Sequence, residues 1–304
     1  MVLELKTIEE GVKSRIGGPR LKAILQGVQL DAEKLWCTAR PRNFVHGIIL
    51  ITLFKDMTGV SYRDLIKDVA GWAHFSNDAI THNVKKCRVA LRTWAKGVLA
   101  PQSHARLERM ASKSNRPKGL DKVVLWIDST DFRVKGKRAA HRDKSKWSHK
   151  LRSPGRRWVT VTNVKGQALW VSSPYLPTVY DGDITISAAS ELDHLFPKHH
   201  MVGDNHFRKA APFLKSVVLH TNIAKSGRPK VVEGKKVPVS LSKEEEAWNE
   251  KISMVRGKIE SPYGWVKRVF LSLDKPFYEN EKQHDCIVHV ALACHRLVLD
   301  KQQS

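Results

Sequence analysis

The stretch KVVLWID (122–128) decides the fold class, because it is an apolar run of strand length that ends on a carboxylate. Two β-rich runs follow, RWVTVTN (157–163) and QALWVSS (167–173), and the short Val-Lys-Gly link between them predicts a hairpin. MVGD (201–204) is another apolar run that ends on Asp, and SVVLHT (216–221) is a further strand. Strands mixed with helical segments predict an α/β domain with a mixed sheet flanked by helices.

Helical segments are expected around these strands, at residues 183–195, 206–214, 242–260 and 281–299. Upstream, the apolar segment 43–57 is long enough for a buried helix, whereas residues 1–30 show no strong period. The polar stretch 112–122, which contains Pro and Gly, is the best candidate for a linker. We therefore divide the chain into a helical N-terminal region, residues 1–115, and an α/β domain, residues 116–304.

Residues 59–100 predict two helices joined by a short turn near Gly71, with Ser76 as the N-cap of the second helix. The first helix has an apolar face of Tyr62, Leu65, Ile66 and Val69, and the second has one of Ile80, Val84, Cys87 and Leu91. This arrangement predicts a helix-turn-helix. Its second helix would present Asn77, Thr81, His82, Lys85 and Lys86 to DNA. A plain helical hairpin without a DNA contact is the alternative.

The composition is strongly basic, with 53 Lys and Arg against 30 Asp and Glu and a net charge of +23. Such a charge attracts polyanions. Nucleic acid is favoured over an anionic membrane or an acidic protein, because the basic residues alternate with aromatic ones, with two basic loops at 133–157 and 224–236. A solvated basic surface with no dedicated partner is the alternative. No apolar run reaches 18 residues, so no membrane span is expected.

Two of the predicted strands end in an acid, Asp128 and Asp204, and strand ends lie at the rim of a sheet, where α/β folds bind ligands. A third carboxylate has to come from another segment. Residues 241–268 are predicted as one helix that begins with a capping box of Ser242 and Glu245. Glu260 lies immediately beside the buried stripe of this helix, which consists of Trp248, Ile252, Val255 and Ile259.

Three carboxylates in one site suit phosphodiester cleavage, which needs an activated nucleophile and a stabilised leaving oxyanion. Two Mg²⁺ ions about 3.5–4 Å apart supply both, and Mg²⁺ prefers carboxylate and water ligands. We therefore take Asp128, Asp204 and Glu260 as candidate metal ligands. The alternative is that Asp128 caps a turn and Glu260 pairs with Arg256. A zinc site is a weaker hypothesis, since the spacing of the nearby histidines fits no standard site; these are His194, His199, His200 and His206.

The segment from Asp128 to Lys267 resembles the nuclease domain of the PIF/Harbinger transposases, within a wider group that includes transposases of bacterial insertion elements. The most specific match is RGKIESPYGWVK (256–267), against the family pattern R-x-x-[IV]-E-x-x-x-G-x-[LV]-K. IDST (127–130) matches the D-x-T motif and DNHF (204–207) matches D-x-x-[YF]. Residues 177–181 match the G-S-V-H-D turn in part, and residues 58–84 resemble the helix-turn-helix of the family. Pro262 departs from the pattern and is expected to kink the helix.

This resemblance implies an RNase H-like fold and DNA cleavage that depends on a divalent metal, Mg²⁺ or Mn²⁺, held by Asp128, Asp204 and Glu260. It implies a DNA transposase, or an endonuclease derived from one, that cuts and joins double-stranded transposon ends by a two-metal mechanism. In a eukaryote it would act in the nucleus, beside a Myb-like DNA-binding partner protein; otherwise it would be cytoplasmic and associated with the nucleoid.

Further expectations concern the surface and the assembly. Basic side chains near the acids are expected to hold backbone phosphates: Lys150, Arg152, Arg256, Lys267 and Arg268. A homodimer is expected, because transposition holds two DNA ends together. The alternative is a non-catalytic DNA-binding protein derived from a transposase, which shares the charge and the helices. A basic RNA-binding protein is less favoured, since none of the short RNA-binding signatures is present.

Overall fold

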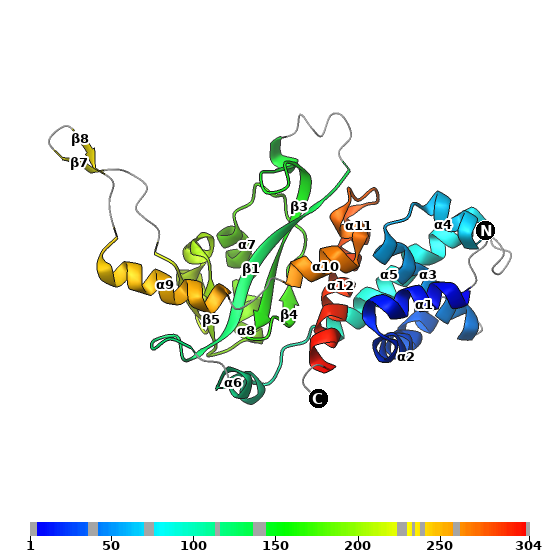
Figure 1. The fold of residues 1–304 in the computed structure, drawn as a ribbon, viewed down its shortest axis with the longest axis horizontal. Helices are drawn as coiled ribbons and strands as arrows, with labels where there is room; N and C mark the ends of the chain where they lie inside the picture. The colour runs from blue at the N-terminus through cyan, green and yellow to red at the C-terminus, as the bar shows by residue number, and fades with distance from the viewer. Residues whose placement is uncertain are drawn as a thin grey trace.

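The computed structural model describes residues 5–35, 42–69, 76–112, 116–135, 144–223, 230–232, 235–237, 241–257 and 262–301. A helical region forms one end of the molecule and a sheet with its covering helices forms the other, with the last helices between them (Figure 1). The helical region consists of α1 (Leu5–Ile16), α2 (Gly18–Leu35), α3 (Arg42–Thr58), α4 (Tyr62–Val69) and α5 (Asn77–Val98).

The first two helices lie in residues 1–30, where the sequence showed no strong period. Both carry a narrow apolar stripe at helical spacing, and every member of it is buried: Ile8, Val12 and Ile16 in α1, and Leu21, Ile24 and Val28 in α2. Each turn contributes only one apolar residue to the stripe, and charged residues lie between them. A pattern that is based on a broad apolar face therefore does not detect it.

The two helices of the predicted helix-turn-helix are both present as α4 and α5. Ser76 is the N-cap of α5, where its hydroxyl accepts a hydrogen bond of 3.2 Å from the backbone N–H of Ala79. The predicted apolar face of α5 is buried, as is Leu65 of α4. Residues 70–75, which contain the predicted turn, lie outside the described residues, so the helix-turn-helix stays a prediction.

One mixed sheet forms the centre of the α/β part, in the order β4–β3–β1–β5–β6. Its strands are β1 (Val123–Arg133), β3 (Ser153–Asn163), β4 (Ala168–Val171), β5 (His200–Gly203) and β6 (Val218–Thr221). The β3–β4 hairpin is confirmed, and β3 is antiparallel to β1 while β5 and β6 run parallel to it. This topology is compatible with an RNase H-like fold. The short β2 (Trp147–Ser148) pairs with the beginning of β3.

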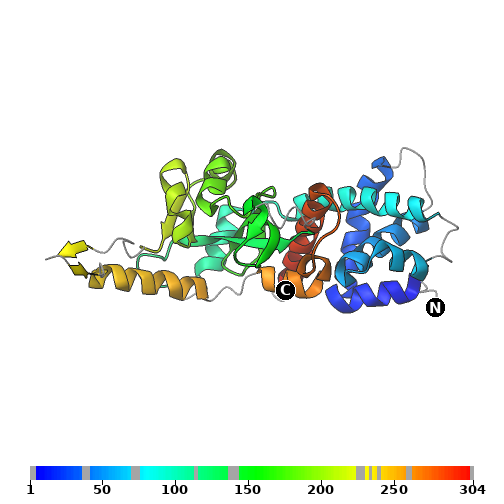
Figure 2. The ribbon, with the colours of Figure 1, turned by 90° about the horizontal axis from the view of Figure 1, so that it is seen from above.

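Helices cover both faces of this sheet (Figure 2). On one face α6 (His104–Ser112), α7 (Asp181–Ser187) and α8 (Ala189–Leu195) enclose a core with Leu125 and Ile127 of β1. On the other face α9 (Lys243–Gly257) packs Ile252 and Val255 against Trp126. The remaining short elements are η2 (Lys144–Lys146), the 3₁₀ helix η3 (Asn205–Phe213), and the separate hairpin of β7 (Lys230–Val232) and β8 (Lys235–Val237).

Two helices lie within the segment 241–268 that was predicted as one helix, and residues 258–261 between them lie outside the described residues. The capping box is confirmed, with Ser242 N–H donating to Glu245 at 2.8 Å and Glu245 N–H to the Ser242 hydroxyl at 3.2 Å. However, α9 ends at Gly257, and α10 (Pro262–Val269) begins at Pro262. Proline is favoured at the first position of a helix because no N–H is needed there, so Pro262 suits its place as the first residue of α10. The kink expected at Pro262 stays a prediction, because residues 258–261 lie outside the described residues.

The C-terminal helices join the sheet to the helical region (Figure 1). They are α10, α11 (Leu271–Asp274) and α12 (Glu281–Lys301). One hydrophobic core contains buried residues of α1 to α5, of these three helices, and Phe132 and Trp158 of the sheet. The domain boundary near residue 115 stays a prediction, but this core extends across it.

A buried ion network fastens the same junction. The guanidinium of Arg88 on α5 makes ion pairs with Asp56 of α3 and with Glu279, which precedes α12, at 2.7 Å for Glu279. Lys55 lies 3.6 Å from the same Glu279 carboxylate. Arg88 is fully buried, so these partners replace the water that its charge would otherwise require. Within the described residues, no helix is long and apolar enough to cross a membrane.

Candidate metal and nuclease site

Asp128 and Asp204 lie side by side on neighbouring parallel strands. The register pairs Trp126 of β1 with Val202 of β5, and each aspartate comes two residues later in the chain. Asp204 follows the last residue of β5, as expected. Asp128 does not end β1, as was predicted, but lies in its middle opposite Thr160, because β1 continues along β3 after its pairing with β5 has stopped. The alternative in which Asp128 caps a turn is thereby excluded.

Asp204 is held in place by the element that follows it. It is the N-cap of η3, and one carboxylate oxygen accepts a hydrogen bond of 2.8 Å from the backbone N–H of His206. The other oxygen lies 4.0 Å from the Arg256 guanidinium near the end of α9. The Asp204 side chain is 24% exposed, so the carboxylate remains open to a ligand.

Asp128 is half-buried and electrostatically strained. Burial raises the pKa of its carboxyl, the Ser129 backbone N–H and the cations Lys150 and Arg256 oppose that shift, and the neighbouring Asp204 adds to it. Two carboxylates side by side, one of them in a partly dry position, would both be stabilised as anions by a hard cation. The donor set therefore fits Mg²⁺ or Mn²⁺.

Two side chains of α10 bond to β1 next to the acid pair. The Tyr263 hydroxyl donates a hydrogen bond of 3.0 Å to the backbone carbonyl of Asp128. One turn later, the Lys267 ammonium donates to the Thr130 hydroxyl at 3.3 Å and to the Asp131 carbonyl at 3.2 Å. Lys267 therefore contacts the strand itself, and its predicted role at a DNA phosphate stays a prediction.

Glu260, the predicted third acid, lies outside the described residues, as does its alternative pairing with Arg256. The described residues on either side of it both contact the site, since Arg256 lies near Asp204 and Tyr263 binds the carbonyl of Asp128. Among the residues that the structure describes, no group of three or more His, Cys, Asp or Glu side chains is arranged to hold a metal.

Among the predicted phosphate contacts, the structure brings Lys150 and Arg256 to the acid pair. The Lys150 ammonium lies 3.5 Å from the Ser129 hydroxyl. Arg152 and Arg268 are exposed. The predicted DNA contacts of α5 lie in the helical region, on the other side of α10 to α12 from the sheet (Figure 1). His82 and Lys85 are exposed there, Thr81 and Lys86 are half-buried, and the side chain of Asn77 lies outside the described residues.

Sequence reasoning missed a buried network on the opposite face of β1. Arg157 of β3 donates to both carboxylate oxygens of Asp131, at 2.8 and 3.2 Å, and forms an ion pair of 3.1 Å with Asp181. The Ser148 hydroxyl donates to Asp131 at 2.6 Å and accepts from the N–H of Leu151 at 3.1 Å. This network holds the turn that carries Lys150. Its signal is the register that pairs Asp131 with Arg157, and the sequence alone does not give that register.

The histidines near Asp204 do not form a common site. The rings of His199 and His104 are joined by a hydrogen bond of 2.9 Å, and those of His200 and His220 by another of 2.9 Å. Each pair engages one nitrogen of each ring, and His199 Nδ1 remains buried without a hydrogen-bond partner. Among the described residues, these histidines belong to no group of three or more possible metal ligands, so the zinc hypothesis gains no support.

The comparison with protein families gives one match. The family described as "DDE superfamily endonuclease" matches residues 127–297, a span that contains Asp128, Asp204 and Glu260. Comparisons with curated proteins and with solved structures give no match. The family match covers more than half of the 304 residues and coincides with the sheet and its acid pair. The chain therefore belongs to the DDE superfamily endonucleases.

Proposed function

We propose that the protein is a metal-dependent DNA endonuclease of the transposase type, in which Asp128, Asp204 and Glu260 hold Mg²⁺ or Mn²⁺. The observation that carries this proposal is the closeness of Asp128 on β1 and Asp204 just after β5. Arg256 and Tyr263, which precede and follow Glu260 in the chain, contact these two aspartates. The bound cations would supply charge for the attacking and leaving oxygens. Carboxylates serve here as ligands and not as general acids or bases.

The chain's own residues supply binding and orientation. Lys150 and Arg256 place positive charge beside the acids, where the backbone phosphates flanking the cut would lie. Tyr263 and the backbone N–H of His206 fix the two aspartates before any substrate arrives, which lowers the cost of ordering the site during the reaction. The net charge of +23 draws DNA to this surface.

The finer proposals rest on the resemblance in the sequence. They are the PIF/Harbinger type, recognition of transposon ends through α4 and α5, a homodimer, a Myb-like partner, and action in the nucleus or on the nucleoid. The binding-only protein shares these surfaces, so cleavage separates the two readings.

Nicking of a supercoiled plasmid in Mg²⁺ or Mn²⁺ tests the proposal. We expect the native protein to nick and EDTA to abolish nicking. Asp128→Asn, Asp204→Asn and Glu260→Gln should each reduce it by at least about 100-fold, because each removes a metal ligand. Asp183→Asn, which changes an exposed acid paired with Lys209, is the matched control and should leave nicking unchanged.

Two outcomes would overturn the assignment. Nicking that persists in Asp204→Asn would show that the acids are not the site. DNA binding without nicking, in the native protein and in the variants alike and with both metals, would favour the binding-only protein.

A further inference from the structure

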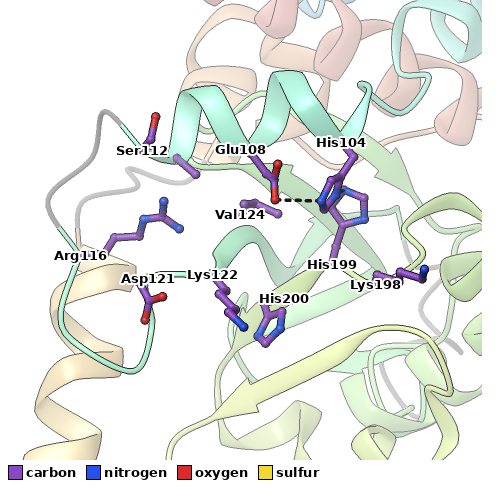
Figure 3. Close-up of a pocket in the computed structure, with 11 residues that line it drawn as sticks. His104, Glu108, Ser112, Arg116, Asp121, Lys122, Val124, Lys198, His199 and His200 are labelled. Carbon is purple, nitrogen blue, oxygen red and sulfur yellow. Dashed lines mark hydrogen bonds and ion pairs between the residues drawn. The ribbon is translucent and has the colours of Figure 1, made fainter.

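A pocket of about 390 Å³ lies near the beginning of β1 and β5, at the opposite end of these strands from the acid pair. Figure 3 shows the residues that line it. It opens between α6, the turn before β1 and the beginning of β5. Val124 and His200 line it, and each lies four residues before an aspartate of the site, Asp128 and Asp204. Four residues of strand span about 13 Å, so the pocket is separate from the acids.

Arg116 and Lys122, two of the three cations that line this pocket (the third is Lys198), lack an ion-pair partner among the described residues. The Arg116 guanidinium points into the pocket, and Lys122 lies beside His200 (Figure 3). Arg116 is half-buried, it donates to the backbone carbonyl of Val123, and its Nε is buried with no hydrogen-bond partner. Within the part of the chain that the structure describes, no ion pair joins either cation to a carboxylate, and Asp121 acts on Arg116 only through the charge of its carboxylate. A half-buried guanidinium without a counter-ion is costly, and a bound anion would remove that cost.

The acids of the pocket are engaged elsewhere. Glu108 forms a contact of 2.9 Å with His104, which is in turn bonded to His199. Asp121 accepts a hydrogen bond of 3.3 Å from the backbone N–H of Gly119, which shapes the turn. Neither carboxylate neutralises Arg116 or Lys122, although Asp121 is close enough to act on the charge of Arg116.

We propose that this pocket binds a phosphate group of the DNA backbone, through Arg116 and Lys122. The identity of the ligand rests on the proposed function. Lys122 lies six residues before Asp128, a strand distance of about 20 Å. At about 3.4 Å per base pair, this corresponds to roughly six base pairs of duplex DNA. The pocket would therefore fix the direction in which DNA leaves the nuclease site.

Fluorescence anisotropy with a labelled duplex in EDTA tests this inference without any cleavage. We expect the double variant Arg116→Gln/Lys122→Gln to bind several-fold more weakly and to lower the slope of log affinity against log salt by about 1, the value for one lost phosphate contact. Lys118→Gln removes an exposed lysine of the same turn that does not line the pocket, and should leave the slope unchanged. Thermal melts establish that each variant is folded.

A gain of affinity gives a second readout that misfolding could not produce. Asp121→Asn removes the carboxylate nearest Arg116, so DNA should bind several-fold more tightly. Glu250→Gln makes the same change of net charge on exposed α9 and is the control for a general charge effect. The inference is overturned if the double variant behaves like Lys118→Gln, or if Asp121→Asn behaves like Glu250→Gln.

The source of the phosphate and the proposed function are tested separately. Inorganic phosphate at constant ionic strength should compete with DNA on the native protein but not on the double variant. If inorganic phosphate raises the melting temperature through these two residues while the DNA slope is unchanged in the double variant, the ligand is free phosphate and the DNA assignment fails. The native protein could fail to nick plasmid while the double variant still shows the lower slope of log affinity against log salt. That result would contradict the proposed nuclease and would support this pocket as a DNA contact.

Discussion

At the scale of single residues, Asp128 links the stability of the protein to its chemistry. A buried carboxyl with a raised pKa is more costly to ionise in the folded chain than in the unfolded one. The folded state therefore holds its proton more firmly, and the contribution of Asp128 to stability falls as pH rises through the ordinary range of an aspartate and above it. At neutral pH the ionised Asp128 opposes folding.

The unfavourable contribution of ionised Asp128 to folding can be tested with Asp128→Asn. We expect the variant to melt a few degrees above the native protein at pH 7, and the difference to vanish below the ordinary aspartate range, where both side chains are neutral. Mg²⁺ should raise the melting temperature of the native protein only, because it binds the ionised acid pair. Scanning fluorimetry across pH, with and without Mg²⁺, measures both effects. A variant that is less stable at pH 7 would contradict this account of the site.

At the scale of elements, the ion network around Arg88 joins α3, α5 and the segment before α12. Arg88→Met would leave Asp56 and Glu279 buried without their partner, which costs about 3–5 kcal/mol when a buried pair is broken. Urea unfolding at pH 7 measures the loss. Lys85→Met changes an exposed residue about one turn earlier on α5 and should alter stability by no more than about 0.5 kcal/mol.

The pH dependence of that variant carries further information. In the native protein Arg88 and Lys55 hold the pKa of the Glu279 carboxyl down against the effect of its burial. Without Arg88, the buried Glu279 carboxylate can relieve its charge by taking up a proton, so the loss of stability should shrink as pH falls toward the carboxylate range. A loss that is constant with pH would show that Arg88 acts through packing and not through charge.

The elements also show how far the sequence could predict this molecule. The positions of the strands follow from the apolar runs of the sequence, and so does the approach of Asp128 to Asp204 on neighbouring strands, although Asp128 lies within β1 and does not end it. Other features depend on the register between segments distant in sequence, which local patterns do not encode. Thus the continuation of β1 beyond Asp128 depends on β3, and the bond between Asp131 and Arg157 depends on the same pairing. Pro262 was noticed, but its place at the start of α10 was not foreseen.

At the scale of the whole molecule, the shared core bears on the predicted division at residue 115. Buried residues of α12, among them Ile287, Ala291 and Cys294, belong to one core with α5 and α2. A fragment of residues 116–304 would expose this apolar face to water. We expect the fragment to aggregate, or to lose its cooperative thermal transition, whereas the full chain melts in one transition. Calorimetry of both, with co-expressed 1–115 as a rescue, decides the matter. A soluble, cooperatively melting fragment would show that the division is real.

The same core sets an order of events during synthesis. Residues of α5 meet α12, about 200 positions later in the chain, so α1 to α5 emerge from the ribosome long before residues 281–301 can cover them. During that interval the newly synthesised helices expose the apolar surface that α12 later covers, and chaperones bind exposed apolar surface of this kind. The helical region can therefore complete its core only after the C-terminal helices have been translated. The ion pair of Asp56 and Arg88 can form within the early helices, whereas the pair of Arg88 and Glu279 can form only after Glu279 has been synthesised.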